Sequence, residues 1–163
     1  MRKDISGNFW SDIMPRPTQF KYNYFNIKGH INSFTEEYEI FDENYNCEFI
    51  YFGDKWNSVL EAYKAKVEDD FTKSQKLKLM GNILYSFYLQ NDKAAAILLS
   101  TKEMWLEKKV KDHDNFWHSC NCIDCFFDSG NNYYGKLLME IRDYLIWKNK
   151  RTVGRKAWES KYL

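Results

Sequence analysis

Two histidines and three cysteines fall within thirteen consecutive residues: His113, His118, Cys120, Cys122 and Cys125. Cys122 and Cys125 have the spacing with which two thiolates hold one zinc ion, and His118 or Cys120 could complete such a site. However, one short loop seldom supplies four tetrahedral ligands, and the sequence contains no second pair of ligands at a similar spacing. Free loop cysteines are therefore the favoured interpretation, and a zinc site is the alternative.

Overall charge and composition exclude several other classes of protein. The 163 residues include 24 Lys and Arg against 23 Asp and Glu, so no strong overall field attracts nucleic acid. With 44% hydrophobic and 18% aromatic residues, the chain is not of the disordered class. No apolar run is long enough to span a membrane, and the N-terminus lacks the apolar stretch of a signal peptide. We expect a soluble, cytoplasmic protein without disulfides.

The elements that must position these side chains indicate an α+β domain, with a small antiparallel sheet packed against several helices. Residues 20–52 alternate aromatic and aliphatic residues with polar ones, which predicts two or three short antiparallel strands. Gly53-Asp54 is a turn signal, and Ser58 is suited to be a helix N-cap. Helical spacing of apolar residues predicts helices over residues 58–67, 74–90, 93–100 and 135–147.

The last of these helices is strongly amphipathic. Its apolar face consists of Leu137, Leu138, Ile141, Tyr144 and Leu145. Arg142 falls toward the other side of the helix. Residues 148–163 carry six Lys and Arg against one acidic residue, which predicts a basic, solvated tail or a short terminal helix.

Common phosphate-binding loops and hydrolase signatures are absent from the sequence. One segment, however, resembles the signature of a known family. Residues 130–142 read GNNYYGKLLMEIR and resemble the G-x-N-x-x-G-x-x-L-M-x-x-R signature of the NADAR (YbiA-like) family. Upstream, residues 114–117 (DNFW) resemble the family's D-x-x-W element, and residues 98–101 (LLST) resemble its L-L-x-T. Leu106-Glu107 resembles more loosely the L-x-E that follows L-L-x-T in the family.

The N-terminal half resembles the family less closely. Residues 10–17 (WSDIMPRP) are similar to the opening L-S-N-F-x-P-x-P, with Asp12 where Asn is usual. Residues 56–65 (WNSVLEAYKA) are similar to W-P-T-x-E-H-x-x-Q-A. The resemblance extends over most of the chain from Gly53 to about Leu145, within one domain spanning residues 1–163, and residues 18–50 look like an insertion.

The resemblance implies an N-glycosidase that cleaves a bond between ribose C1 and a nitrogen without a metal or other cofactor. Family substrates are ribosylamino-pyrimidine intermediates of riboflavin synthesis and ADP-ribose attached to guanine bases. Such cleavage passes through an oxocarbenium-like state, and it requires a carboxylate close to the anomeric carbon that stabilises the positive charge and activates water. The candidate acids are Glu61 and Asp114. The candidate substrate-binding residues are Trp10, Asp12, Lys64, Trp117, Asn132 and Arg142.

Several of these residues have a structural alternative. Asp114 and Trp117 are three residues apart and could place a carboxylate beside a ring that stacks on the base. The structural alternative is that Asp114 is a surface acid and Trp117 a core residue. Asn132 is either a ligand contact or a turn residue with left-handed backbone that caps the following helix. Arg142 is expected to buttress the site or to pair with a carboxylate.

The departures from the family pattern leave a second function open. An alignment without gaps places the family's acidic residue at Leu60 and its His at Glu61, while Lys64 stands where Gln is usual and His118 where Gly is usual. The alternative is therefore a catalytically impaired protein that binds an ADP-ribose-like or cyclic nucleotide, as a phage counter-defence sponge or sensor would. A zinc-stapled interaction domain is a third reading. Nucleic acid is expected only as a modified substrate, and no membrane partner is expected.

Overall fold

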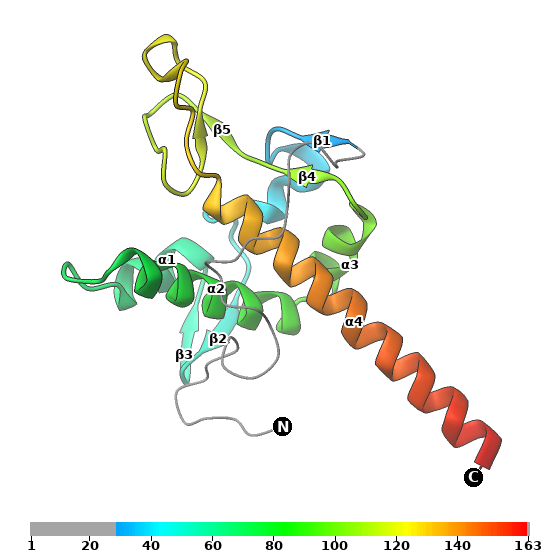
Figure 1. Cartoon of the computed structure of the whole chain (residues 1–163). Helices are drawn as coiled ribbons and strands as arrows, with labels where there is room; N and C mark the ends of the chain where they lie inside the picture. The colour runs from blue at the N-terminus through cyan, green and yellow to red at the C-terminus, as the bar shows by residue number, and fades with distance from the viewer. Residues whose placement is uncertain (1–28, 163) are drawn as a thin grey trace.

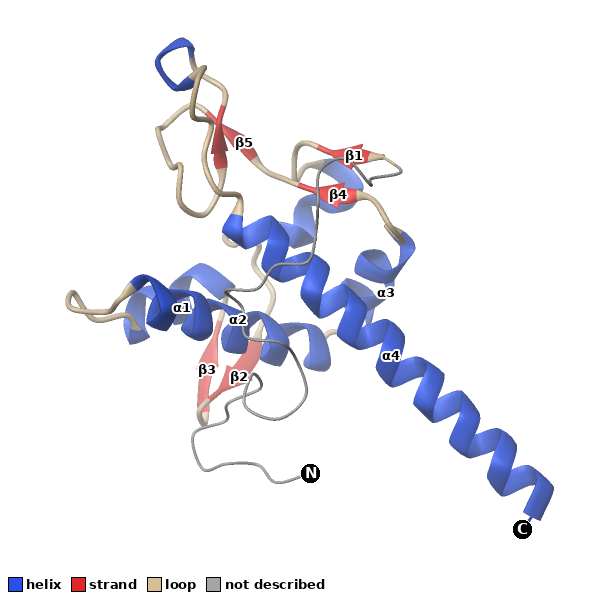
Figure 2. Cartoon of the chain, viewed as in Figure 1, coloured by secondary structure: helices blue, strands red, loops and turns tan. Residues whose placement is uncertain are grey.

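The computed structural model describes residues 29–162, and the α+β class is confirmed. Two long helices, α2 (Lys73–Gln90) and α4 (Tyr133–Tyr162), pack against each other in the middle of the fold (Figure 1). The short helix α1 (Val59–Lys66) packs on α2, and α3 (Asp92–Ser100) packs on both α2 and α4. Short strands and loops fill the space around this helical body (Figure 2). Trp10 and Asp12 lie outside the described residues.

The first three helices match the predicted ranges because their termini carry local signals. Ser58 caps α1 as predicted, since its Oγ accepts a hydrogen bond from the Glu61 amide at 3.1 Å. Thr72 and Gln75 form a capping box at the start of α2, in which each side chain binds the other residue's amide. These hydrogen bonds satisfy amides that the first helical turn leaves without partners.

The strands differ from the prediction of one antiparallel sheet. Within residues 29–162 they form three separate two-stranded ladders, β1 (His30–Ile31) with β4 (Trp105–Leu106), β2 (Phe49–Tyr51) with β3 (Asp54–Trp56), and β5 (Lys109–Val110) with β6 (Ser119–Cys120). Only the β2–β3 hairpin is antiparallel; it turns at Phe52-Gly53, where both residues have positive φ. The other two ladders are parallel: β1 and β4 come from distant segments of the chain, whereas β5 and β6 are joined by the short connection of residues 111–118.

Within the predicted strand region, residues 36–41 instead form a 3-10 helix, η3 (Glu36–Phe41). Its last two residues, Ile40 and Phe41, are buried in the core. Ladders of two or three residues contribute few backbone hydrogen bonds, so tertiary packing rather than strand propensity decides the conformation here.

The predicted apolar face of α4 is buried at all five positions. The prediction that Arg142 lies on the side of the helix away from the apolar face is wrong, because this residue is buried and only 1% exposed. It is tolerated there because Nη1 donates to Thr101 Oγ1 at 2.9 Å and to the Met104 carbonyl at 2.8 Å. Arg142 thereby holds the end of α3 and the approach to β4 against α4.

The predicted helix end near residue 147 is also wrong, because α4 continues without a break to Tyr162. Residues 148–157 are exposed, and the helix projects away from the body (Figure 1). No proline interrupts this stretch, and Arg155 pairs with Glu159 one turn later at 2.9 Å. No helix among residues 29–162 is both long and apolar enough to cross a membrane.

Candidate functional site

The loop that leads into α4 has a backbone that only particular residues allow. Gly130 has φ +117° and Asn132 has φ 50°, both in the left-handed region. A Cβ on Gly130 would lie 2.7 Å from the Asn115 backbone, and one on Gly135 would collide with the Leu106 carbonyl oxygen. The two glycines of the signature therefore allow the loop to pack closely against the segments carrying Asn115 and Leu106.

Asn132 has the structural role that the sequence offered as one alternative. It is 3% exposed, and its Nδ2 donates to the Leu106 carbonyl at 2.9 Å. Its Oδ1 is buried and accepts no hydrogen bond from the described residues. Asn132 thus joins the turn to β4 and keeps one acceptor unused.

The segment with Asp114 and Trp117 runs alongside this loop. The amides of Tyr133 and Tyr134 donate to the carbonyls of Phe116 and Trp117, at 3.3 and 3.0 Å. Asp114 Oδ1 accepts the amides of Phe116 at 3.2 Å and Trp117 at 2.9 Å, so this carboxylate shapes its own loop. The partly buried Trp117 ring packs edge-to-face on Tyr63 of α1 and on Phe116.

Two lysines meet over an aromatic ring at the N-terminal end of α4. Nζ of Lys73 lies 4.6 Å from the centre of the Tyr133 ring, and Nζ of Lys136 lies 5.5 Å from it. Burial and the charge of Lys73 lower the pKa of Lys136, while Glu107 acts in the opposite direction. An anion bound at this pair would relieve the repulsion between the two charges.

Glu107 is the acidic residue near this pair that the sequence-based assignment of site residues missed. It directly follows β4, is partly buried, and accepts a hydrogen bond from Ser119 Oγ at 2.5 Å. Its position at the carboxyl end of a buried strand, within the segment that resembles L-x-E, was the available signal.

A second charged group lies beneath the loop. Glu43 Oε1 lies 2.8 Å from His118 Nε2 and 3.2 Å from Lys108 Nζ, and Lys108 also pairs with Asp42 at 2.7 Å. Burial would raise the pKa of Glu43, but the hydrogen bond from His118 and the charges of His118 and Lys108 together lower it to about 2. The Glu43 carbonyl also accepts the amide of Leu60, the position of the family's acidic residue, at 2.8 Å.

Glu61 and Lys64 lie on the exposed side of α1, the helix whose Tyr63 contacts the Trp117 ring. Glu61 Oε2 accepts the Asn57 amide at 2.7 Å, so Glu61 contributes to the N-terminal cap of its own helix. Val59, Ala62 and Tyr63 form the buried side of α1. The structure therefore brings the segment of Asp114 and Trp117 together with Asn132, whereas Arg142 is buried in the core and the side chains of Glu61 and Lys64 are exposed.

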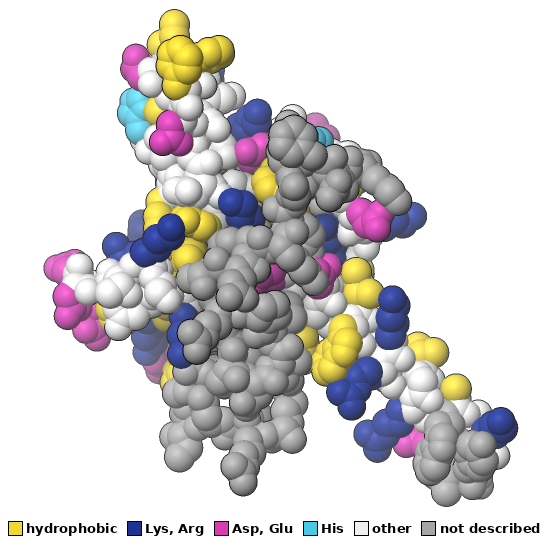
Figure 3. All heavy atoms as spheres, in the orientation of Figure 1, with side chains coloured by type: hydrophobic (Ala, Val, Ile, Leu, Met, Phe, Trp, Pro, Cys, Tyr) yellow, Lys and Arg dark blue, Asp and Glu magenta, His cyan; other side chains and the backbone are white. Residues whose placement is uncertain are grey.

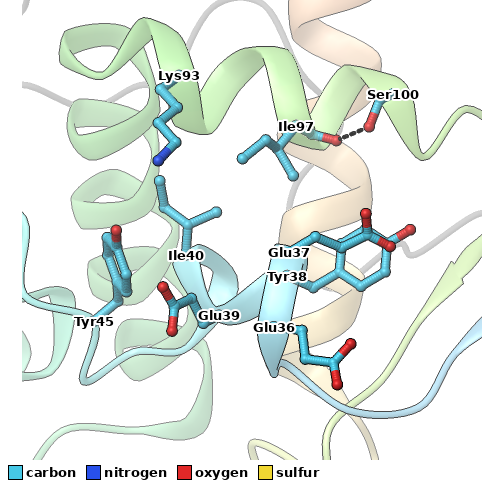
Figure 4. A pocket seen from close by; sticks show the side chains of 9 residues that line it. All are labelled: Glu36, Glu37, Tyr38, Glu39, Ile40, Tyr45, Lys93, Ile97 and Ser100. Carbon is cyan, nitrogen blue, oxygen red and sulfur yellow. Dashed lines mark hydrogen bonds between the residues drawn. The ribbon is translucent and has the colours of Figure 1, made fainter.

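A cavity of about 300 Å³ lies between η3 and α3, remote in sequence from these residues (Figure 4). It is lined by Glu36, Glu37, Tyr38, Glu39, Ile40, Tyr45, Lys93, Ile97 and Ser100. Three glutamates against one lysine make a poor receptor for a phosphate group. Two more cavities, of about 250 and 240 Å³, contain none of the predicted site residues either.

The comparisons bear on the fold. No protein-family model and no curated protein sequence matches the chain. Among solved structures, the NMR structure of the E. coli protein YbiA is similar, with a TM-score of 0.63 and 20% sequence identity. The likeness covers 83% of this chain and 95% of YbiA. The chain therefore has a YbiA-like fold.

Proposed function

We propose that this protein is an N-glycosidase of the NADAR type, which hydrolyses the ribosyl C–N bond of an ADP-ribosylated or N-ribosylated nucleotide. The observation that carries the proposal is the group of Lys73, Lys136, Tyr133 and Glu107 at the start of α4. It lies at the loop that resembles the family signature, in a chain with a YbiA-like fold.

The two lysines suit a phosphate group of the substrate. Lys136 is partly buried next to a second cation, an arrangement that is costly without an anion and favourable with one. The dipole of α4 adds a partial positive charge at the N-terminus of this helix, in the same region. The aromatic rings of Phe116, Trp117 and Tyr133 offer apolar surface for the base.

Glu107 is the carboxylate best placed to stabilise the oxocarbenium-like state. Glu61 and Asp114 each use one oxygen to bind amides of their own turns, and Glu107 likewise accepts a hydrogen bond from Ser119. Glu107 differs in that it lies close enough to Lys136 for their charges to interact. In the proposed step, the C1–N bond breaks and its electron pair leaves with the base, while a water oxygen bonds to C1 and Glu107 accepts one proton from that water. The leaving base takes up a proton from solvent, and Glu107 returns its proton to solvent, so one water is consumed per bond cleaved. Asp114 then positions Trp117, and Glu61 stabilises α1.

The test is a mass-spectrometric assay of purified protein with a panel of substrates: ADP-ribose, NAD, cyclic ADP-ribose isomers, ADP-ribosylated guanine in DNA, and a ribosylamino-pyrimidine phosphate. The free fraction is analysed first, and the compounds released by heating the protein are analysed afterwards. A freed base with a matching ribose product supports the glycosidase. An intact compound recovered only after heating indicates the alternative, a protein that sequesters the nucleotide.

Variants then assign the carboxylate. We expect Glu107→Gln to abolish turnover with retained folding, while Glu68→Gln, which changes an exposed acid on the loop after α1, retains it. Asp114→Asn and Glu61→Gln are measured in parallel. Loss of turnover in either of these, with Glu107→Gln still active, would overturn the assignment of Glu107.

A further inference from the structure

We propose that His113, Cys120, Cys122 and Cys125 bind one structural zinc ion. The four residues belong to a lobe of residues 109–131 that projects beyond the N-terminal end of α4 (Figure 1). One ligand atom from each residue, Nδ1 or Sγ, lies within 4.8 Å of all the others. No other group of three or more such ligands occurs among the described residues.

The distances agree with tetrahedral coordination. Nδ1 of His113 lies 3.4 Å from Sγ of Cys122, 3.4 Å from Sγ of Cys125 and 4.0 Å from Sγ of Cys120. With Zn–S and Zn–N bonds of about 2.3 and 2.05 Å, a tetrahedron requires N···S separations of about 3.5 Å. Small side-chain movements would therefore complete the coordination.

The backbone explains how one short segment supplies four ligands. The β5–β6 ladder brings Cys120 back beside Val110, three residues before His113, and His113 turns with φ 65°. Cys122 and Cys125 flank a single turn, closed by a hydrogen bond from the Cys125 amide to the Cys122 carbonyl at 3.2 Å. The Cys120 amide bonds to the Ser129 carbonyl at 2.6 Å, which closes the loop behind the cysteines.

The lobe lacks an apolar core that could hold this turn. Ile123, Phe126 and Phe127 are 90%, 78% and 98% exposed, and Figure 3 shows hydrophobic side chains covering the outer end of the lobe. A segment of about twenty residues without a buried core requires another source of stability, and a metal ion is a common one.

A further polar group supports the cluster and connects it with the rest of the fold. Asn115 Nδ2 donates to Cys125 Sγ at 3.6 Å, the kind of outer hydrogen bond that orients a metal ligand. The Asn115 carbonyl accepts the Asn131 amide at 2.9 Å. The zinc would thus also fix the segment of Trp117 against the start of α4.

The donor set selects the metal and its role. Three thiolates and an imidazole suit zinc and are a poor match for the hard cations Mg²⁺ and Ca²⁺. Four protein ligands leave no open position for substrate, so the role is structural. His118, the other histidine of the segment, is bonded to Glu43 and is not a ligand.

The first test measures metal content. Full-length protein, purified without chelators after growth with zinc, is analysed by elemental mass spectrometry, and we expect one zinc per chain. Cys125→Ser and His113→Asn should lose it. The matched controls Cys47→Ser and His30→Asn, which change the cysteine and histidine outside the lobe, should retain it. Zinc retained in both lobe variants, or lost in the controls, would overturn the proposal.

The second test uses the wild-type chain, so that it does not depend on the folding of a variant. We expect a strong chelator to release the zinc and to expose residues 111–130 to limited proteolysis, while the helical body stays intact, and added Zn²⁺ should restore protection. Co²⁺ should give the absorption bands of a tetrahedral thiolate site. Protein that contains no metal, with its thiols either free or joined as disulfides, and that fails to take up Zn²⁺ after reduction would contradict the proposal.

Discussion

Glu43 and His118 form a hydrogen bond of 2.8 Å although 75 residues separate them in the sequence. The bond joins the loop after η3 to the segment that precedes β6, and Lys108 extends it to Asp42. His118 is 3% exposed. Its position opposite a carboxylate explains how a buried histidine is accommodated here, where the NADAR pattern that the sequence resembles has glycine.

We expect Glu43→Gln to destabilise the fold by about 2 to 4 kcal/mol at pH 7. The folded-state pKa of Glu43 is about 2, below the ordinary 4.5, so its contribution is fully present above pH 4.5 and is lost as the pH falls toward 2. Chemical denaturation at pH 7 and pH 3 should therefore show a smaller difference between variant and wild type at pH 3. Glu48→Gln, which breaks an exposed pair with Lys55, should change stability by less than about 1 kcal/mol.

We expect Gly135→Ala to cost at least about 2 kcal/mol or to prevent folding. The new methyl carbon would lie 2.5 Å from Asn132 Oδ1 and would collide with a backbone oxygen that cannot move aside easily. Gly154→Ala in the same helix has open space around its Cβ and should instead stabilise the protein by about 0.5 to 1 kcal/mol. Equal stabilities of the two variants in thermal unfolding would contradict this account.

Arg142→Lys should lower the stability by about 2 to 4 kcal/mol. A single ammonium cannot reproduce the geometry of the guanidinium, whose Nη1 bonds to both Thr101 and Met104. Urea denaturation measures the effect. The exposed Arg151→Lys should stay within about 0.5 kcal/mol of wild type, and an equally small loss for Arg142→Lys would show that its bonds contribute little.

Lys136→Met should leave the thermal stability of the ligand-free protein unchanged or raise it, while it weakens nucleotide binding about tenfold or more. Burial and Lys73 lower the pKa of Lys136, so the folded state disfavours the charged form, and this cost falls as the pH rises through that lowered pKa. Calorimetric titration with the ligand identified above, alongside the exposed Lys111→Met, measures the affinity. Unchanged affinity would remove Lys136 from the site.

The sequence predicted the helices of the body well because their signals are local. The cap at Ser58 and the apolar spacing of α2 and of the first half of α4 predict α1, α2 and the start of α4 to within a few residues. The strands were predicted poorly, since ladders as short as His30–Ile31 with Trp105–Leu106 exist only through long-range packing. The end of α4 was missed because the polar outer half of this helix has no apolar periodicity. The absence of proline there was the one sign that the helix could continue.

The site residues stay a prediction, and their arrangement in space was beyond the reach of the sequence. Backbone bonds between residues 116–118 and 132–134 bring the segment of Asp114 and Trp117 together with Asn132, a contact that no spacing along the chain indicated. No local pattern could show that Arg142 is buried or that Glu107 lies near Lys136, because both relationships cross between elements. Likewise, the spacing offered His118 or Cys120 to complete a zinc site, whereas the structure groups His113 and Cys120 with Cys122 and Cys125 and pairs His118 with Glu43.

The uninterrupted α4 also has a mechanical consequence. Its 30 residues form a rod of about 45 Å, of which only the first half is embedded in the protein. A tilt of about 5° at Gly135 would swing the far end through about 4 Å, given that length. The helix is thus a lever whose fulcrum lies at the loop of Asn132, so that a label near residue 160 would magnify any small shift of that loop.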